Sequence, residues 1–292
     1  GARSMVASSG GGFALMVEGV SLAGITETPL VIDLGMRPGP ATGMPTWTEQ
    51  AELWMAIHAG HGEFSRIVLA PGDASEAYSQ TIEAFELADR FHIPVFILTD
   101  KYLNESQWCV GEDDLAKRSP FSRGKIVFDK VPVGSEFKRY DLNTDDGVSI
   151  RSVPGVKNGH FLANSYEHDE VGLTTEDAKM RTDMVNKRMK KHAAILTSMQ
   201  KPTIVGDEHP DITFVSWGST KGAILSAMEL LKTKGKTAKL IHFPWVYPLS
   251  KEVVTPLLSG HKRLICVENN ATGQFAQVIR EETGVTIPET LL

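Results

Sequence analysis

Cysteine is scarce in this sequence of 292 residues. Only Cys109 and Cys266 occur, far apart along the chain. A disulfide framework is therefore not expected, and so few cysteines fit a reducing, cytoplasmic compartment. Two cysteines are also too few to ligate a four-cysteine iron–sulfur cluster. If the protein works with such a cluster, another chain must carry it.

Long hydrophobic runs are absent too, since no apolar stretch approaches the roughly 20 residues that span a bilayer. The first residues, GARSMVASSGGG, lack the charged and apolar regions of a signal peptide. The formal net charge of −6 gives the surface no general attraction for nucleic acid or acidic membranes. We therefore expect neither a nucleic-acid nor a membrane partner. The length of the chain suits two domains.

Strands and helices alternate in the first half of the sequence. Apolar, β-rich runs predict strands at 28–35, 66–70 and 94–99, and helical spacing predicts helices at 13–22 and 75–91, the latter starting near Ser75. This alternation favours a parallel sheet covered on both faces. Met5 to Ser8 predict a further strand that enters a glycine-rich turn almost at once, so we expect a chain that begins inside a domain.

Residues 103–175 differ, because they are polar and rich in Gly, Pro and Asp. They predict an irregular excursion, followed by a helix at 175–199. The basic run 187–191 in that helix favours a solvated face over a binding patch, and the YEHDE run at 166–170 favours an exposed acidic loop. A second α/β unit follows, with strands at 212–217, 238–243 and 263–268 and helices at 219–234 and 250–259.

The first candidate site is Ser8-Ser9-Gly10-Gly11-Gly12, between a strand and a helix. Glycines let the backbone turn tightly and let another group approach closely, so the run suits a bound ligand. It matches neither a Walker A loop nor G-x-G-x-x-G, so no nucleotide is indicated. A close-packed turn between the strand and the helix is the alternative.

The second candidate is the loop from Arg37 to Thr46, RPGPATGMPT, directly after a predicted strand. Ligands of open parallel sheets bind beyond the carboxyl ends of the strands. An arginine held there by a stiff loop suits a bidentate grip on a carboxylate, and Thr42 adds a hydroxyl group. A structural loop with a surface arginine is the alternative.

Two further polar clusters are open to more than one interpretation. His58, His61 and Glu63 invite a metal site, but their spacing is not H-E-x-x-H, and packing beside a ligand is favoured. The run ENNATGQ at 268–274 suits contact with a ligand or partner, or else helix capping by Asn270 or Thr272. No Ser/His/Asp triad or G-x-S-x-G elbow is visible. The residues alone indicate an α/β protein that binds a small acid.

Together these motifs resemble the alpha subunit of 2-oxoacid:ferredoxin oxidoreductases. The resemblance covers essentially the whole chain. It is carried by SSGGGFALMVEGVSLAGITETPLVIDLGMRPGPATGMPTWTEQAEL, HGEFSRIVLAPGD, EAFELADRFHIPVFILTD, RSVPG, YEHDE and VENNATGQFAQVIR. The resemblance implies a thiamine-diphosphate pyrimidine-binding-type domain over residues 1–200 and a transketolase C-terminal-like α/β domain over residues 201–292.

The resemblance also implies an activity and its partners. The chain would be a subunit of an enzyme that oxidatively decarboxylates a 2-oxoacid, best 2-oxoglutarate, with coenzyme A and ferredoxin. Thiamine diphosphate would be shared with a beta subunit, which would carry Mg²⁺ and a [4Fe-4S] cluster. A heterodimer or a dimer of heterodimers is expected.

The resemblance assigns site residues as well. Arg37 matches the family's substrate-binding arginine and Thr42 a nearby hydroxyl contact. Ser8, Ser9, Gly10 and Gly11 would lie near the cofactor. It assigns no catalytic residue to this chain.

The sequence departs from the family in three ways. Family members have an upstream segment with a Tyr-Pro-Ile-Thr-Pro-like motif and the Glu that activates thiamine, and neither occurs here, so we expect the isolated chain to be inactive. Ala41 stands where Ser is usual, and the Gly triplet replaces Gly-Pro-Gly. The alternatives are a non-catalytic assembly piece, specificity for pyruvate or branched 2-oxoacids, and a transketolase- or acetolactate-type enzyme, against which the RPGPATG loop speaks.

Overall fold

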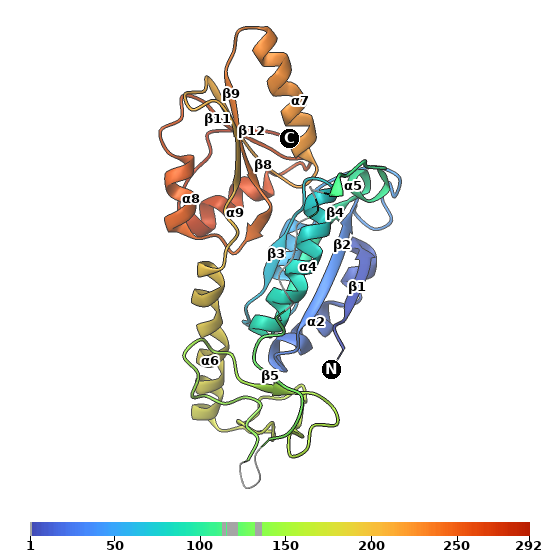
Figure 1. The fold of residues 1–292 in the computed structure, drawn as a ribbon, viewed down its shortest axis with the longest axis vertical. Helices are drawn as coiled ribbons and strands as arrows, with labels where there is room; N and C mark the ends of the chain where they lie inside the picture. Colours follow the sequence, from blue (N-terminus) through green and yellow to red (C-terminus); the bar gives the residue numbers. More distant parts are fainter. Residues whose placement is uncertain (1, 113–114, 116–121, 132–135) are drawn as a thin grey trace.

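The computed structural model describes residues 2–112, 115, 122–131 and 136–292. Within them the strands form two five-stranded sheets and one two-stranded ladder. The first sheet lies in the middle of the molecule and the second at its upper end in Figure 1, with the excursion at the lower end. No helix in the described part of the chain is long and apolar enough to cross a membrane.

The first sheet contains the strands predicted in the first half of the sequence. Its strand order is β1 (Met5–Ser9), β2 (Leu30–Met36), β4 (Pro94–Asp100), β3 (Ile67–Leu69) and β10 (Trp245–Tyr247). The first four strands are parallel, and β10 pairs antiparallel with β3. All seven residues of β4 are buried, because helices cover both faces of this central strand.

The helices of the first half confirm the predicted alternation, with two changes. They are α1 (Gly10–Ala14), α2 (Val17–Ile25), α3 (Leu53–His58), α4 (Ala74–Phe91) and α5 (Lys101–Glu105). The helix predicted at 13–22 is interrupted, and Leu15 at the break is 90% exposed. The start predicted at Ser75 is wrong, because Asp73 caps α4 by accepting a hydrogen bond from the backbone N–H of Glu76 at 2.9 Å.

The second sheet also keeps its predicted strands and gains two at its edges. Its order is β12 (Glu289–Leu291), β11 (Leu264–Val267), β8 (Ile212–Trp217), β9 (Ala238–Phe243) and β7 (Thr203–Gly206), and β7 alone is antiparallel. Its helices are α7 (Thr220–Thr233), α8 (Lys251–Leu258) and α9 (Gln274–Thr283). The domain boundary near residue 200 stays a prediction, since β10 comes from beyond it and joins the first sheet.

The excursion contains little regular structure where it is described, as predicted. A short parallel ladder pairs β5 (Ile126–Val127) with β6 (Arg151–Ser152). Residues 113–114, 116–121 and 132–135 of the predicted excursion lie outside the described residues. The helix α6 (Ala178–Thr197) then leads from the excursion to the second sheet (Figure 1).

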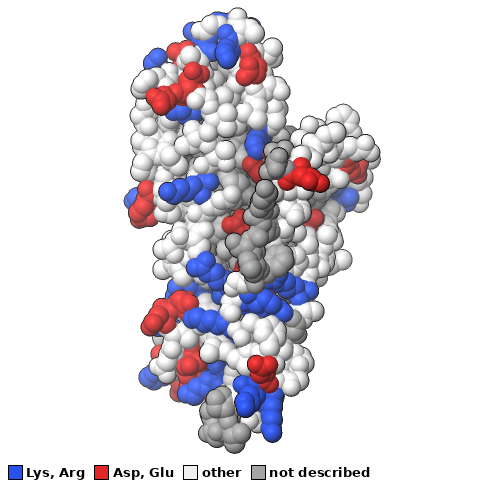
Figure 2. Space-filling view, viewed as in Figure 1, with Lys and Arg blue, Asp and Glu red and all other residues white. Residues whose placement is uncertain are grey.

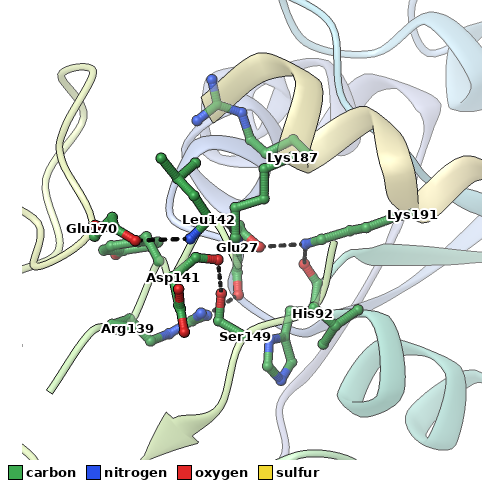
Figure 3. A network of polar contacts seen from close by, with 12 residues as sticks. Glu27, His92, Arg139, Asp141, Leu142, Ser149, Glu170, Lys187 and Lys191 are labelled. Carbon is green, nitrogen blue, oxygen red and sulfur yellow. Dashed lines mark hydrogen bonds and ion pairs between the residues drawn. The ribbon is translucent and has the colours of Figure 1, made fainter. Parts of the chain in front are cut away.

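The interpretation of the basic run in α6 as a solvated face is wrong. Lys187, Arg188 and Lys191 are all buried. Lys187 and Lys191 converge on the carboxylate of Glu27, as Figure 3 shows. Arg188 pairs with Glu167 at 2.7 Å. The run therefore fastens α6 to the first domain and the excursion.

The interpretation of the YEHDE run as an exposed acidic loop is wrong in part. His168 is fully buried, and its ring lies 4.0 Å from the ring of Tyr140, centroid to centroid. Glu167 binds Arg181 as well as Arg188. Only Tyr166 of this run is clearly exposed, at 67%. Glu170 pairs with Lys138 at 2.8 Å, whereas Asp169 accepts hydrogen bonds from nearby backbone N–H groups.

Candidate functional site

A cavity opens at the carboxyl ends of β1, β2 and β4. Because these strands are parallel and in register, with Ser9 opposite Gly35 and Gly35 opposite Thr99, their ends meet at one edge. The cavity has a volume of about 360 Å³. It is lined by Ala7, Ser8, Ser9, Asp33, Gly35, Met36, Arg37, Pro45, Lys101, Asn104 and Glu105. The position agrees with the general rule for ligand sites in parallel sheets.

The predicted cofactor-binding run lies partly in the lining of this cavity and partly beside it. Ser8 and Ser9 line it, whereas Gly10 and Gly11 begin α1 beside it. A side chain at two of the glycines would displace a neighbouring side chain. A Cβ atom on Gly12 would lie 2.0 Å from Ser8 Oγ, and one on Gly10 would lie 2.9 Å from Glu52 Oε1. The glycines therefore let α1 pack against the serines and against Glu52, as the close-packing alternative requires, while the serines face the cavity.

Arg37 is half-buried and lines the cavity, at the point where the chain leaves β2. The loop behind it is held closed by the backbone N–H of Met44, which donates to Pro38 O at 3.0 Å. Gly43 has φ +55°, and a Cβ atom there would lie 1.8 Å from Pro38 O. This position therefore requires glycine. Thr42 lies exposed on the loop and is not among the residues that line the cavity.

Glu52 is a residue that sequence reasoning missed. It precedes α3, and its Oε2 atom is buried without a hydrogen-bond partner among the described residues. Burial, followed by the nearby Glu49 carboxylate, raises the pKa of Glu52 to about 7, although Arg37 opposes the rise. Glu49 in turn accepts a hydrogen bond from the Gly39 backbone N–H at 3.3 Å. The spacing Glu49-x-x-Glu52 after a proline-rich loop was the available signal.

A chain of polar contacts forms another wall of the cavity. Thr99 Oγ1 donates to Asp33 Oδ1 at 2.8 Å, and Asn104 Nδ2 donates to Thr99 Oγ1 at 2.9 Å. Burial raises the pKa of Asp33, although the hydrogen bond from Thr99 opposes the rise. Lys101 is paired with Glu105. Of the two cations that line the cavity, Arg37 has no ion pair among the described residues that line it.

The ENNATGQ run is structural, which confirms the helix-capping alternative. Asn270 Oδ1 accepts hydrogen bonds from the backbone N–H groups of Gly273, at 2.8 Å, and Gln274, at 3.3 Å. Glu268 accepts from the backbone N–H of Phe275 at 2.8 Å. Thr272 makes no cap of this kind, since its own backbone N–H donates to Asn270 Oδ1.

The same run also holds the second domain against the segment that follows the arginine loop. Gln50 is fully buried, and its Oε1 accepts from the Asn269 backbone N–H at 3.0 Å. Gln50 Nε2 donates to Trp217 O at 3.0 Å. The Gln50 backbone N–H donates to Asn269 O at 2.7 Å. The loop that carries Arg37 is therefore anchored at its far end by the second sheet.

The His58–Glu63 cluster does not converge on one point. His61 Nδ1 lies 3.1 Å from Ser21 Oγ, which also accepts from the His61 backbone N–H at 2.8 Å, and His58 is exposed. Among the described residues, no group of three or more His, Cys, Asp or Glu side chains could hold a metal ion.

Comparison with known proteins shows the family. Residues 1–187 match the family model described as pyruvate flavodoxin/ferredoxin oxidoreductase, thiamine diP-bdg. The chain belongs to this family. Residues 183–284 match the transketolase C-terminal domain. The fold class predicted from the sequence, and the family resemblance, are thereby confirmed.

Individual relatives are named as subunits of enzymes that act on 2-oxoacids. The chain is 40% identical to 2-oxoacid:ferredoxin oxidoreductase 2, subunit alpha, of Aeropyrum pernix, over 98% of this chain and 44% of the relative. It is 28% identical to 2-oxoglutarate synthase subunit KorA of Methanothermobacter marburgensis, over 100% of this chain and 76% of the relative. The chain thus spans about half the length of the first of these relatives.

A solved structure is also similar over the whole chain. It is the 2-oxoglutarate:ferredoxin oxidoreductase from Magnetococcus marinus with 2-oxoglutarate, coenzyme A and succinyl-CoA bound. The TM-score is 0.86 at 31% identity, and the match covers 100% of this chain and 50% of that one.

Proposed function

We propose that this chain holds the substrate carboxylate in an enzyme that oxidatively decarboxylates a 2-oxoacid. The reaction converts the 2-oxoacid, coenzyme A and two oxidised ferredoxins into acyl-CoA, CO₂, a proton and two reduced ferredoxins. The observation that carries the proposal is Arg37, a half-buried arginine in the cavity at the carboxyl ends of the first sheet. A guanidinium that has no ion pair with any described residue is available for bidentate binding of a carboxylate.

The proposed substrate is 2-oxoglutarate. Two relatives support this choice by name, the KorA subunit of 2-oxoglutarate synthase and the Magnetococcus marinus enzyme with 2-oxoglutarate bound. Arg37 would hold the carboxylate next to the oxo group, which every 2-oxoacid shares. Residues outside this cavity must therefore recognise the distal carboxylate, which distinguishes 2-oxoglutarate from pyruvate and branched 2-oxoacids.

The cavity fits one end of thiamine diphosphate. Ser8 and Ser9 line the cavity and carry hydroxyl groups, and the space at Gly11 beside the cavity is open, since a Cβ atom there would meet nothing within 4 Å. These groups suit the nitrogen atoms of a pyrimidine ring, with Gly10 and Gly11 leaving room beside it. When bound, thiamine diphosphate supplies the nucleophilic carbon that attacks the 2-oxo carbon. The family description of residues 1–187 as thiamine-diphosphate-binding supports this assignment.

The beta subunit is proposed to carry the remaining cofactors. The two cysteines of this sequence cannot ligate a four-cysteine cluster, which supports placing a [4Fe-4S] cluster outside these residues. The described residues also offer no group of acidic side chains suited to Mg²⁺. We further propose a heterodimer or a dimer of heterodimers with the beta subunit. This complex would work in the cytoplasm and pass electrons to ferredoxin.

The chain's own residues would orient the substrate rather than transfer electrons. Arg37 fixes the carboxylate, while the hydrogen bond of Glu49 and the clamp at Gln50 hold its loop. Thr42 is proposed to reach the substrate from the exposed loop. Such positioning places the 2-oxo carbon for attack and is worth several kcal/mol of the activation barrier.

The test is coenzyme-A-dependent reduction of a viologen dye by the alpha subunit in complex with its beta partner. The complex receives 2-oxoglutarate, pyruvate or 2-oxoisovalerate in turn. Arg37→Ala should lower kcat/KM at least 100-fold, and Arg37→Lys should recover part of the loss, because lysine keeps the charge but not the fork. Arg263→Ala is the matched control, since Arg263 is exposed and pairs with Glu289 on the second sheet.

Each result of this test has a clear meaning. Activity lost in Arg37→Ala and kept in Arg263→Ala supports the carboxylate role, and the preferred acid identifies the substrate. Full activity in Arg37→Ala rejects the proposed site. No activity with any acid, from a complex that contains thiamine diphosphate and cluster, favours a non-catalytic assembly piece.

A further inference from the structure

A second cavity lies at the opposite end of the first sheet. Leu30 and Val31, at the amino end of β2, line it, whereas Gly35 and Met36, at the carboxyl end, line the candidate active site. Its volume is about 540 Å³. The excursion closes it from the other side, mainly through residues 151–156 and 159–163. Nothing in the proposed reaction uses this space.

Basic side chains outnumber acidic ones around this cavity. Asp89 receives Arg3 at 2.8 Å, Arg123 at 3.1 Å and Arg151 in a short contact. The pKa of Arg151 is lowered mainly by burial and further by the neighbouring arginines, although Asp89 opposes the fall. One carboxylate therefore faces three guanidinium groups.

Basic side chains also outnumber acidic ones around Glu27, which does not itself line the cavity. Glu27 binds Lys187 at 2.5 Å and Lys191 at 2.6 Å, and its backbone oxygen accepts from Arg139 Nη2 at 2.6 Å (Figure 3). Among the described residues, Glu27 thus pairs with two lysines through its carboxylate and with Arg139 through its backbone oxygen. Lys and Arg side chains are also dense on the lower part of the molecular surface, where the excursion lies (Figure 2).

Arg139 is left with unused hydrogen-bonding capacity. It is 2% exposed and lines the cavity. Its Nη1 atom is buried and has no hydrogen-bond partner among the described residues. A buried, charged N–H group without a partner costs on the order of 1–3 kcal/mol or more, so proteins rarely leave one unsatisfied. A ligand with an acceptor oxygen would remove this cost.

The walls of the cavity add an apolar requirement. Phe85 and Phe161 line it together with Val156. The Arg139 guanidinium lies 5.7 Å from the centroid of the Phe161 ring, so the charge sits directly beside an aromatic surface. A ligand that satisfies both features carries an oxyanion next to an apolar or aromatic group.

We propose that this cavity is a binding site for a small organic anion, separate from the candidate active site. A phosphate or carboxylate group of the ligand accepts hydrogen bonds from Arg139 and Arg151, and its apolar part packs between Phe85 and Phe161. Bound ligand supplies an acceptor oxygen for Arg139 Nη1, which has no hydrogen-bond partner among the described residues. It also links the first sheet to the excursion, because both provide walls of the site.

Isothermal titration calorimetry on the alpha–beta complex tests the proposal. The probes are inorganic phosphate, phenyl phosphate and benzoate, each titrated without 2-oxoacid. Phenyl phosphate or benzoate should bind at least threefold more tightly than inorganic phosphate, because only they fill the aromatic part. Comparison of the two aromatic probes distinguishes a phosphate site from a carboxylate site. If inorganic phosphate binds as tightly as both aromatic probes, the proposal that the ligand carries an organic group is rejected.

Variants locate the site. Ala163 is exposed and lines the cavity, so Ala163→Glu adds a carboxylate without touching the ion network, and Ala163→Gln is its neutral match. The dissociation constant of the tighter probe should rise at least tenfold in Ala163→Glu and less than twofold in Ala163→Gln. Arg139→Gln should abolish binding; circular dichroism checks its fold.

Two results would overturn the proposal. Equal affinity of all three Ala163 forms would place the bound anion elsewhere. Absence of saturable binding of every probe to the wild-type complex would reject the site altogether.

Discussion

Lys187 Nζ lies 2.5 Å from Glu27 Oε1, although 160 positions separate the two residues along the chain. Both side chains are at most 1% exposed. Burial on its own would raise the pKa of Glu27, but Lys191, Lys187 and Arg139 outweigh it and hold that pKa far below its usual range. The pair fastens α6 to the turn after α2, and through it the excursion to the first sheet.

Replacing Glu27 by Gln should lower the free energy of unfolding by about 3–5 kcal/mol, because it leaves two buried lysines without their counter-ion. Urea unfolding at pH 7 measures the loss. The matched control is Lys179→Ala, which removes an exposed ion pair with Asp183 and should cost less than about 0.5 kcal/mol. Similar losses in the two variants would contradict the buried role of Glu27.

The contact of Glu76 with Lys221 and His242, which joins α4 to the second sheet and its helix α7, should be sensitive to acid. Burial opposes its ionisation, but hydrogen bonds and charge from His242 and Lys221 lower the pKa of Glu76 to about 2. Its folded pKa lies below the unfolded value of about 4.3, so its stabilisation is complete above about pH 4.3 and is lost as the pH falls toward 2.

Glu76→Gln should therefore cost about 2–3 kcal/mol of unfolding free energy at pH 7 and little at pH 2. Thermal or urea unfolding across this range checks the prediction, with Glu229→Gln, an exposed position on α7, as control. A cost independent of pH would show that packing, and not the charge of Glu76, holds the contact.

Glu52 predicts the opposite pH dependence. Its folded pKa of about 7 lies above the unfolded value of about 4.3, so the protonated form stabilises the fold below about pH 4 and this stabilisation disappears as the pH rises through 7. Glu52→Gln should be close to neutral at pH 5 and more stable than wild type by about 1–2 kcal/mol at pH 8. Urea unfolding at both values measures it, with exposed Glu18→Gln as control. A constant difference would reject the raised pKa.

Replacing Gly43 by Ala should lower the activity of the enzyme with little change in its stability. Gly43→Ala places a methyl group against Pro38 O in a left-handed conformation, which should displace the loop that carries Arg37. The value of kcat/KM for the 2-oxoacid should fall at least tenfold. Gly39→Ala is the matched control in the same loop, because its Cβ atom would meet nothing within 4 Å. Equal activity of the two variants would contradict the role of the closed loop.

The strands and most helices could be predicted from the sequence because local pattern determines them. The run PVFILT is apolar throughout, as a strand buried on both faces must be, and it became β4. The position of Arg37 was predicted for the same reason, since a loop that follows a parallel strand must emerge at the carboxyl edge. Short elements such as β10 carry too few residues to form a recognisable pattern.

The failures concern charges whose partners are distant in sequence. Four basic residues at 187–191, with Met189 between them, have the composition of a solvated helix face, and only the fold reveals Glu27 opposite two of them. Glu52 was missed for a similar reason, because its pKa depends on burial that brings Gly10 and Arg37 beside it. The pairing of Glu27 with the basic run has no local signature in the sequence. For Glu52, the spacing Glu49-x-x-Glu52 signals a pair of carboxylates but not their burial.

The strand β10 limits how this protein can be divided. Trp245 is fully buried and pairs with Leu69 at the edge of the first sheet, and Gln80 Nε2 on α4 donates to Pro244 O at 2.7 Å. A shortened chain that stops near residue 200 would therefore expose β3 as a bare, apolar sheet edge. Such an edge invites strand addition from neighbouring molecules. Expression of the first domain by itself should give aggregates, and any useful dissection must retain residues up to Tyr247.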